Sequence, residues 1–360
     1  MLLGEHGNPH TATVPARPTG LGTSAAALAE AGRPARAVAG LYCPGAVRDD
    51  PALAAEVQQR LDTWATEVGA QPAAVARLGR LAMLTHPDTA DPARLAVAGQ
   101  LLALGAMVHS ATLPSPAASV PVVELPAAGL ANGADAASMS TLMPTLMPMS
   151  APELGAAVDT ALEEMFDACD LPGSAGRPAT PGALTDHPVA VSALAGLSAL
   201  PASPYQVDRV RREYQVLAAS APTRSGPHPP WEHLALGHLN AYSPVLAALD
   251  ALDGYELPPP AAARPELRRV RQLAALAAAL LHDVAAPSPT GLSAAIARAD
   301  GLGAAAAVRR AAAVHDDAMR AFQQHATLLA GSTADLGIRR YLAGLWTWLG
   351  GHRSWHTDRP

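Results

Sequence analysis

The sequence contains no lysine, and all 25 of its basic residues are arginines. Phenylalanine and isoleucine are almost as scarce, with two residues each, whereas alanine and leucine supply most of the apolar residues. The joint scarcity of lysine, isoleucine and phenylalanine indicates codon bias rather than a chemical requirement. We therefore expect a GC-rich source genome, such as that of an actinobacterium.

Cysteine is also scarce, since Cys43 and Cys169 are the only two. Two cysteines cannot form a disulfide framework, which favours a reducing cytoplasm. The N-terminus has no basic region followed by an apolar core, so it does not have the form of a signal peptide. The longest apolar runs, such as Leu273–Leu281, fall short of the roughly 20 residues that a membrane span needs. These absences predict a soluble cytoplasmic protein without a membrane partner.

Positive charge is not concentrated anywhere along the chain. The formal net charge is −6, and no basic stripe is present, which argues against a nucleic-acid partner. The sequence also lacks a nucleophile–base arrangement, a glycine-rich phosphate loop and zinc-finger spacing. Several common classes of active site are therefore not expected.

Two stretches of the chain have no regular apolar period. Residues 1–40 are rich in Pro, Gly, Ala, Ser and Thr, which predicts a disordered leader. Residues 111–151 carry prolines among small residues and predict an irregular excursion. We expect the remainder of residues 41–360 to form one domain.

Helical signals dominate the rest of the sequence. Asp50 followed by Pro51 is typical of a helix start, because the aspartate can cap the helix and proline tolerates its first position. Apolar residues then recur at steps of three and four: Leu53, Val57, Leu61, Trp64 and Val68. Further helices are predicted over Asp91–Val108, Pro152–Cys169, Tyr205–Leu217, Trp231–Leu252, Pro265–Ala286, Ser293–Leu329 and Asp335–Gly351. Strands are not expected, and the predicted fold class is all-α, a single helical bundle.

Six uncommon sequence segments occur in a fixed order along the chain. They are PTGLGTSA (Pro18–Ala25), LYCPGAVRDDPALAAEV (Leu41–Val57), WATEVG (Trp64–Gly69), LGRLAMLTHPDTADPARL (Leu78–Leu95), GYELP (Gly254–Pro258) and RYLAGLWTWLGGHRSWHT (Arg340–Thr357). Together they resemble the bacterial class I terpene synthases, and among these the cyclases of a methylated ten-carbon diphosphate. The resemblance implies a class I terpene synthase-like helical bundle with a deep apolar pocket. It also implies Mg²⁺-dependent ionisation of a prenyl diphosphate, in which oxygen ligands on two facing helices hold the ions.

The sequence departs from the family at both metal-binding motifs. The aspartate-rich motif aligns with Val108–Thr112, which contains His109 and no carboxylate. The second motif retains Asp283 but has His282 in place of Asn, Ala286 in place of Ser and Thr290 in place of Glu. The proline that follows Ala286 should end the helix there, so Thr290 is not expected to face the pocket.

Two further positions depart in the same way. The arginine that the family places against the diphosphate aligns with Gly237, which His238 follows. The C-terminal Arg-Tyr pair of the family is Arg359 and Pro360 here. With these ligands missing, we expect no Mg²⁺ cofactor.

The histidines at these positions leave two interpretations open. His109, His238 and His282 could converge with Asp283 and bind Zn²⁺, another transition metal or haem iron. Alternatively, they are ordinary surface or hydrogen-bonded histidines, and Asp283 is a solvated or capping residue. Three tryptophans on or just after the last predicted helix could shape a carbocation pocket through cation–π contacts or serve as core packing: Trp346, Trp348 and Trp355.

Three hypotheses for function follow. The first is a degenerate member of the family, a pseudoenzyme that binds a small hydrophobic molecule or a prenyl diphosphate. The second is an active, non-standard cyclase of 2-methylgeranyl or geranyl diphosphate. The third is a scaffold, which would form a homodimer, form a heterodimer with a related synthase, or be packaged in a protein shell.

Overall fold

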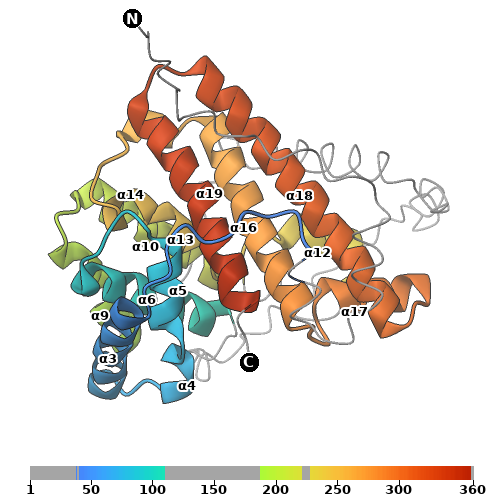
Figure 1. Ribbon diagram of the computed structural model, residues 1–360, viewed down its shortest axis with the longest axis horizontal. Helices are drawn as coiled ribbons and strands as arrows, with labels where there is room; N and C mark the ends of the chain where they lie inside the picture. Colours follow the sequence, from blue (N-terminus) through green and yellow to red (C-terminus); the bar gives the residue numbers. More distant parts are fainter. Residues whose placement is uncertain (1–37, 39, 110–186, 221–227, 358–360) are drawn as a thin grey trace, which may run out of the picture.

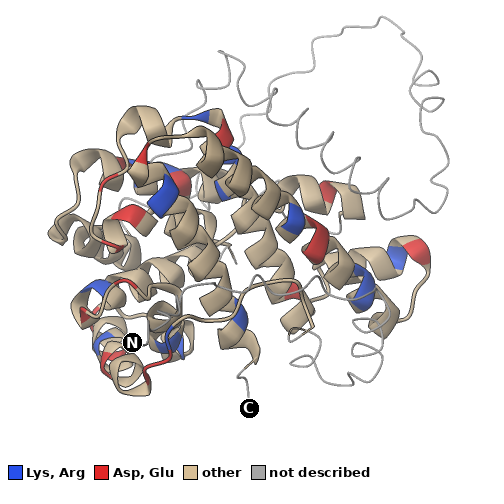
Figure 2. Ribbon diagram, turned by 45° about the horizontal axis from the view of Figure 1, so that its top comes forward, with Lys and Arg blue, Asp and Glu red and all other residues tan. Residues whose placement is uncertain are grey.

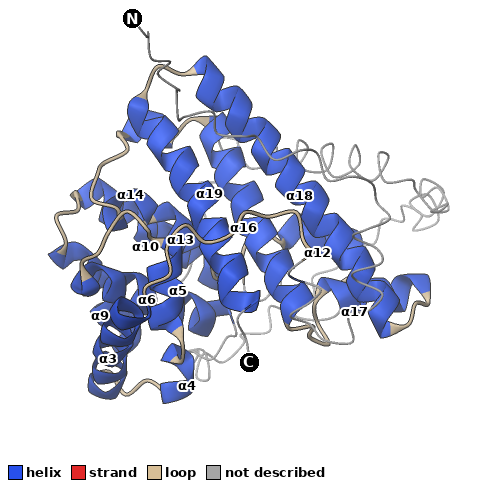
Figure 3. Cartoon of the chain, viewed as in Figure 1, coloured by secondary structure: helices blue, strands red, loops and turns tan. Residues whose placement is uncertain are grey.

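A computed structural model of the protein describes residues 38, 40–109, 187–220 and 228–357, and every regular element in these ranges is a helix (Figure 3). The predicted all-α fold class is confirmed. The leader expected over residues 1–40, apart from residues 38 and 40, lies outside the described residues. The excursion at 111–151 and the helix predicted over Pro152–Cys169 lie outside them as well.

The helices follow one another along the chain in this order: α3 (Pro51–Glu67), α4 (Pro72–Val75), α5 (Leu78–Thr85), α6 (Pro92–His109), α9 (Pro188–Ala199), α10 (Pro204–Ala219), α12 (Pro230–Leu236), α13 (Ser243–Ala247), α14 (Leu249–Leu252), α15 (Pro259–Ala262), α16 (Pro265–Ala285), α17 (Leu292–Asp300), α18 (Ala304–Ser332) and α19 (Leu336–Thr357). Many of them begin with proline, whose missing N–H group costs nothing in the first turn of a helix.

Three long helices, α16, α18 and α19, lie side by side and pack against one another (Figure 1). The helices α3, α5, α6, α9 and α10 gather on one side of α19, whereas α12 and α17 lie towards the other end of α16 and α18. Both groups of shorter helices therefore pack against the three long helices, α16, α18 and α19.

Helix α16 carries an apolar stripe whose members recur at steps of three and four residues. Its six members are all buried: Leu267, Val270, Leu273, Ala277, Leu281 and Val284. Each large apolar side chain that is removed from water contributes about 1.5–3 kcal/mol of stability, so this face fixes α16 within the bundle.

The start predicted for the first helix is also confirmed. The carboxylate of Asp50 accepts hydrogen bonds from the backbone N–H groups of Ala52 and Leu53 at 3.1 and 3.0 Å. These contacts satisfy two of the donors that a helix N-terminus leaves without partners.

Two predicted helices are divided in the structure. The span Trp231–Leu252 forms α12, α13 and α14, because Asn240 turns the chain and its side chain donates to the carbonyl oxygens of Gly237 and Ala275 at 2.7 and 2.9 Å. The span Ser293–Leu329 is broken between α17 and α18 at Gly301, whose φ is 63°. The sequence prediction also missed α4, α5, α9 and α15.

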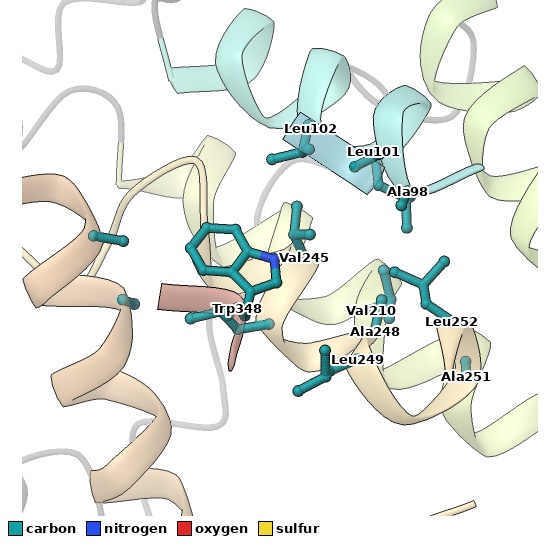
Figure 4. Close-up of a cluster of buried hydrophobic side chains, with 14 of the residues drawn as sticks. Ala98, Leu101, Leu102, Val210, Val245, Ala248, Leu249, Ala251, Leu252 and Trp348 are labelled. Atoms are coloured by element: carbon teal, nitrogen blue, oxygen red, sulfur yellow. The ribbon is translucent and has the colours of Figure 1, made fainter. Parts of the chain in front are cut away.

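The core between α19 and the shorter helices is built around Trp348, which is fully buried. Figure 4 shows its indole ring among Leu101 and Leu102 of α6, Val245 of α13 and Leu249 of α14. The last helix is thereby locked to α6, α13 and α14 by apolar packing.

Acidic and basic residues are interspersed over the described helices rather than gathered by sign (Figure 2). Of the helices that the structure describes, none combines the length and the apolar character needed to cross a bilayer.

Candidate functional site

Asp283 is the carboxylate that the sequence retains at the aligned metal-binding position, and the structure gives it a partner in its own chain. Its Oδ2 atom accepts a hydrogen bond from the backbone N–H of Ser293 at 3.0 Å. The side chain is buried, and its Oδ1 atom lies only 1.8 Å from where a Cβ atom on Gly291 would stand. A carboxylate in this place stabilises the N-terminus of α17 through both the hydrogen bond and the helix dipole.

The end of α16 lies where proline was predicted to stop it. The helix ends at Ala285, and Ala286 caps it with a non-helical φ of −140°. Thr290 follows in an exposed turn outside the helix. The second aligned motif therefore does not continue along one helical face.

Replacing Gly291 with alanine is expected to lower the free energy of unfolding by about 1–3 kcal/mol, because the new methyl group displaces the Asp283 carboxylate from Ser293. Equilibrium urea denaturation followed by circular dichroism measures the change. Gly331→Ala in α18 is the matched control, since its Cβ would meet no atom within 4 Å. If the two variants are equally stable, Asp283 does not hold α17 as described.

The first aligned motif coincides with the end of α6. Val108 is buried there, whereas His109 is exposed and is the last residue of the helix. Residues 110–112 of this motif lie outside the described residues, as do Arg359 and Pro360.

Gly237 lies where the resemblance implies an arginine, at the C-terminal end of α12. A Cβ atom at this position would stand 2.5 Å from a methyl carbon of Leu276 in α16. Next to it, Nδ1 of His238 lies 3.1 Å from the carbonyl oxygen of Ala235. Burial lowers the pKa of His238, and this effect outweighs the opposing influence of that hydrogen bond and of Glu213. A larger side chain at Gly237 would therefore require the Leu276 side chain of α16 to move.

His282 contacts a histidine of α19 that the sequence analysis did not single out. The ring centroids of His282 and His356 are 5.4 Å apart, and those of His356 and His352 are 4.8 Å apart. Both pairs meet edge to face, at 82° and 88°. His282 is exposed, whereas His352 and His356 are buried. The rings therefore form a row that leads from the surface into the bundle.

His352 lies at the inner end of this row. Its ring stacks on Trp348 at 5.2 Å and meets Tyr242 edge to face at 4.7 Å. Burial lowers the pKa of His352 well below its usual value, and three neighbouring imidazoles lower it further: those of His356, His282 and His315. The His352 imidazole is therefore neutral at pH 7. Neither of its ring nitrogens has a hydrogen-bond partner among the described residues.

We refer to His282, His315, His352 and His356 as the imidazole cluster. His315 belongs to α18 and is fully buried, and its Nδ1 lies 3.0 Å from a carboxylate oxygen of Asp316. The spacing of four between His352 and His356 was visible in the sequence and places both on one face of α19. It was missed because no sequence signal pairs that face with His282.

The segment before α3 runs across the long helices (Figure 1). The backbone N–H of Tyr42 donates to Asp316 at 2.8 Å, and the guanidinium of Arg353 donates to the carbonyl oxygen of Cys43 at 3.0 Å. Burial raises the pKa of the Cys43 thiol to about 12, so the thiol stays protonated. This segment ties α18 to α19 next to the imidazoles.

The sequence left open a metal or haem site formed by His109, His238, His282 and Asp283. Among the described residues, no group of three or more His, Cys, Asp or Glu side chains could hold a metal ion. Asp283 contacts the backbone of Ser293, and His282 contacts His356 instead. The structure thus brings His282 together with histidines other than the expected ones.

The chain matches no family model. It is 27% identical over 339 residues to the 2-methylisoborneol synthase of Saccharopolyspora erythraea, an alignment that covers 88% of this chain and 87% of that protein. It is 29% identical to the 2-methylisoborneol synthase of Streptomyces lasalocidi over 95% of this chain and 72% of that one. The crystal structure of the Streptomyces coelicolor A3(2) synthase in complex with Mg²⁺ and geranyl-S-thiolodiphosphate matches with a TM-score of 0.61 and 25% identity, covering 89% of this chain and 95% of that one.

This chain has a class I terpene synthase-like helical fold and is similar in sequence to the 2-methylisoborneol synthases. Its similarity to the 2-methylisoborneol synthases extends along most of its length, and it has their helical fold. The tryptophans of the last helix are packing residues in this terpene synthase fold. Trp348 and Trp355 are buried, and the ring of Trp346 stacks on Phe322 at 6.2 Å.

Proposed function

We propose that this chain keeps the terpene synthase fold but does not carry out the Mg²⁺-dependent ionisation of prenyl diphosphates. In that reaction the diphosphate leaves with several negative charges. Mg²⁺ ions must neutralise this charge as it develops, and hard oxygen ligands must hold the ions. This chain would have to supply those ligands from its own side chains.

The observation that carries the proposal is the environment of Asp283. Its carboxylate is buried and accepts the hydrogen bond of Ser293. Binding of Mg²⁺ through Oδ2 would take this acceptor from the N-terminus of α17, and binding through Oδ1 would require the buried carboxylate to become accessible to a strongly hydrated ion. A buried N–H group without a partner costs about 1–3 kcal/mol, so recruitment of this carboxylate by a metal ion is opposed by the fold itself.

The other aligned positions support the same conclusion. His109 ends α6 and offers an imidazole, Ala286 offers no ligand, and Thr290 lies outside the helix. Imidazole nitrogens bind Mg²⁺ poorly in comparison with carboxylate oxygens. These residues are a poor fit for a Mg²⁺ cluster.

Direct binding of the diphosphate by protonated histidines is also disfavoured. The pKa of His238 is lowered by burial, so this ring is neutral at pH 7. Each charge-assisted hydrogen bond would contribute about 1.5–3 kcal/mol, and a few of them would not replace the Lewis-acid action of several divalent ions. Acid conditions would be needed for even weak binding.

The protein is expected to give no saturable heat when Mg²⁺ and pyrophosphate are titrated into it together. The reason is that a single carboxylate, which already accepts a backbone hydrogen bond, cannot hold several Mg²⁺ ions. Isothermal titration calorimetry measures the binding, and the Streptomyces coelicolor A3(2) synthase, whose crystal structure holds Mg²⁺, serves as the positive control. Saturable binding with micromolar affinity would contradict the proposal.

Two other functions stay predictions. A small hydrophobic ligand could use a hollow of about 310 Å³ between α18 and α19, which is lined mainly by apolar side chains that include Phe322, Leu342 and Trp346. A scaffold role, through a homodimer or with a related synthase, would require neither Mg²⁺ nor turnover.

A further inference from the structure

The hollow of about 310 Å³ between α18 and α19 exists because small side chains line it on both helices. Ala326 and Ala330 line it from α18, and Ala343 lines it from α19. Residues four apart lie on one face of a helix, so the two alanines of α18 open the same side of that helix. The volume is at the lower end of the range for small-molecule sites, which indicates a compact ligand.

The floor of the hollow is apolar and aromatic. Phe322 and Leu342 are buried, and the ring of Phe322 stacks on that of Trp346 with their planes 9° apart. Trp346 lines the hollow and is only half-buried, so part of its indole is accessible to a ligand. An apolar group that covers these side chains is removed from water, and this removal favours binding.

The rim of the hollow carries a cation, Arg339. Its Nε donates to the carbonyl oxygen of Ala330 at 3.1 Å, which holds the guanidinium beside the hollow. Asp335, four residues earlier, does not pair with it but accepts the backbone N–H groups of Gly337 and Ile338 at 2.8 and 3.2 Å. No other carboxylate of the described residues pairs with Arg339. Its two terminal nitrogens therefore have N–H groups to offer to a ligand.

We propose that this hollow binds an amphipathic monocarboxylate, a small molecule that joins one carboxylate to an apolar body of medium length. The body covers Trp346 and the neighbouring floor, and the carboxylate accepts hydrogen bonds from Arg339. A planar guanidinium presents parallel donors that match the two oxygens of a carboxylate. An arginine at the edge of an aromatic floor therefore provides for both halves of such a molecule.

The charge of the lining distinguishes this ligand from a prenyl diphosphate. Among the described residues that line the hollow, Arg339 is the one with a charged side chain. One guanidinium balances one carboxylate, whereas a diphosphate carries several negative charges that call for several cations. None of the aligned metal-binding positions lines the hollow. The site can therefore exist whether or not the protein ionises prenyl diphosphates.

Isothermal titration of the full-length protein with sodium octanoate tests the proposal. We expect saturable binding of one equivalent, and weaker binding of octan-1-ol, which has the same chain length without the charge. Arg339→Gln should weaken octanoate binding by about 10- to 100-fold, the effect of losing a charge-assisted hydrogen bond, and should leave octan-1-ol binding unchanged. Arg309→Gln is the matched control, because Arg309 is an exposed arginine of α18 outside the lining, and it should bind octanoate like the unaltered protein.

Ala343→Leu is the second variant. Ala343 is exposed, so this variant should fold, and circular dichroism checks that each variant does. The larger side chain should occupy the hollow and lower the affinity for octanoate and octan-1-ol alike. Absence of saturable octanoate binding to the unaltered protein would overturn the proposal. Unchanged octanoate affinity in Arg339→Gln or in Ala343→Leu would overturn it as well, because the ligand would then be bound elsewhere. Neither outcome bears on Mg²⁺-dependent turnover, which is measured separately.

Discussion

Replacing Asp250 with alanine is expected to lower the free energy of unfolding by about 3–5 kcal/mol. Asp250 is fully buried, and its carboxylate accepts hydrogen bonds from the guanidinium of Arg209 and from the backbone N–H groups of Ala251 and Leu257, the latter two at 3.0 and 2.9 Å. Arg209 is buried as well, and it also donates to the carbonyl oxygen of Ala247. Removal of the carboxylate therefore leaves a buried cation without its counter-charge.

The contribution of Asp250 can be separated from ordinary surface charge. Asp208→Ala is the matched control, because Asp208 pairs with Arg211 at 2.7 Å where both side chains are about half exposed. Exposed pairs of this kind contribute about 0–1 kcal/mol. Guanidinium denaturation of both variants measures the difference. If Asp250→Ala costs no more than Asp208→Ala, the buried pair does not join α10 to α14 as described.

Local chemistry allowed much of the fold to be predicted. The cap at Asp50, the buried stripe of α16 and the helix stop before Pro287 each depend on residues that are neighbours in the sequence. Helix periodicity and the missing N–H of proline act over a few residues, so they are readable without any tertiary information. The structure confirms these elements at nearly the predicted residues.

Tertiary contacts account for most of what could not be predicted. The break after α12 depends on the side chain of Asn240 reaching Ala275 in α16. The partner of Asp283 is a backbone N–H ten residues further along the chain, in the next helix. Neither contact leaves a periodic signal in the sequence. The sequence therefore predicted one longer helix across Asn240, and it left two interpretations of Asp283 open.

The neighbours of the candidate site residues could not be predicted from the sequence either. The sequence singled out His282 because of its aligned position, and it proposed His109 and His238 as companions. The structure places His356 beside His282 instead. Which face of α19 meets α16 is set by packing around Trp348 and the other buried residues, and spacing alone does not encode that choice.

Incubation of the pure protein with Mg²⁺ and 2-methylgeranyl or geranyl diphosphate at pH 7 tests the central claim most directly. Gas chromatography of the extracts measures cyclic products, with a related 2-methylisoborneol synthase as the positive control. Preorganised positive charge around the departing diphosphate supplies a large part of the rate enhancement of such reactions. Because Asp283 accepts the hydrogen bond of Ser293 and no other carboxylate stands at the described aligned positions, we expect no product above the uncatalysed background. A cyclic terpene that forms with Mg²⁺ and disappears in His282→Ala would contradict the account and make the imidazoles the catalytic groups.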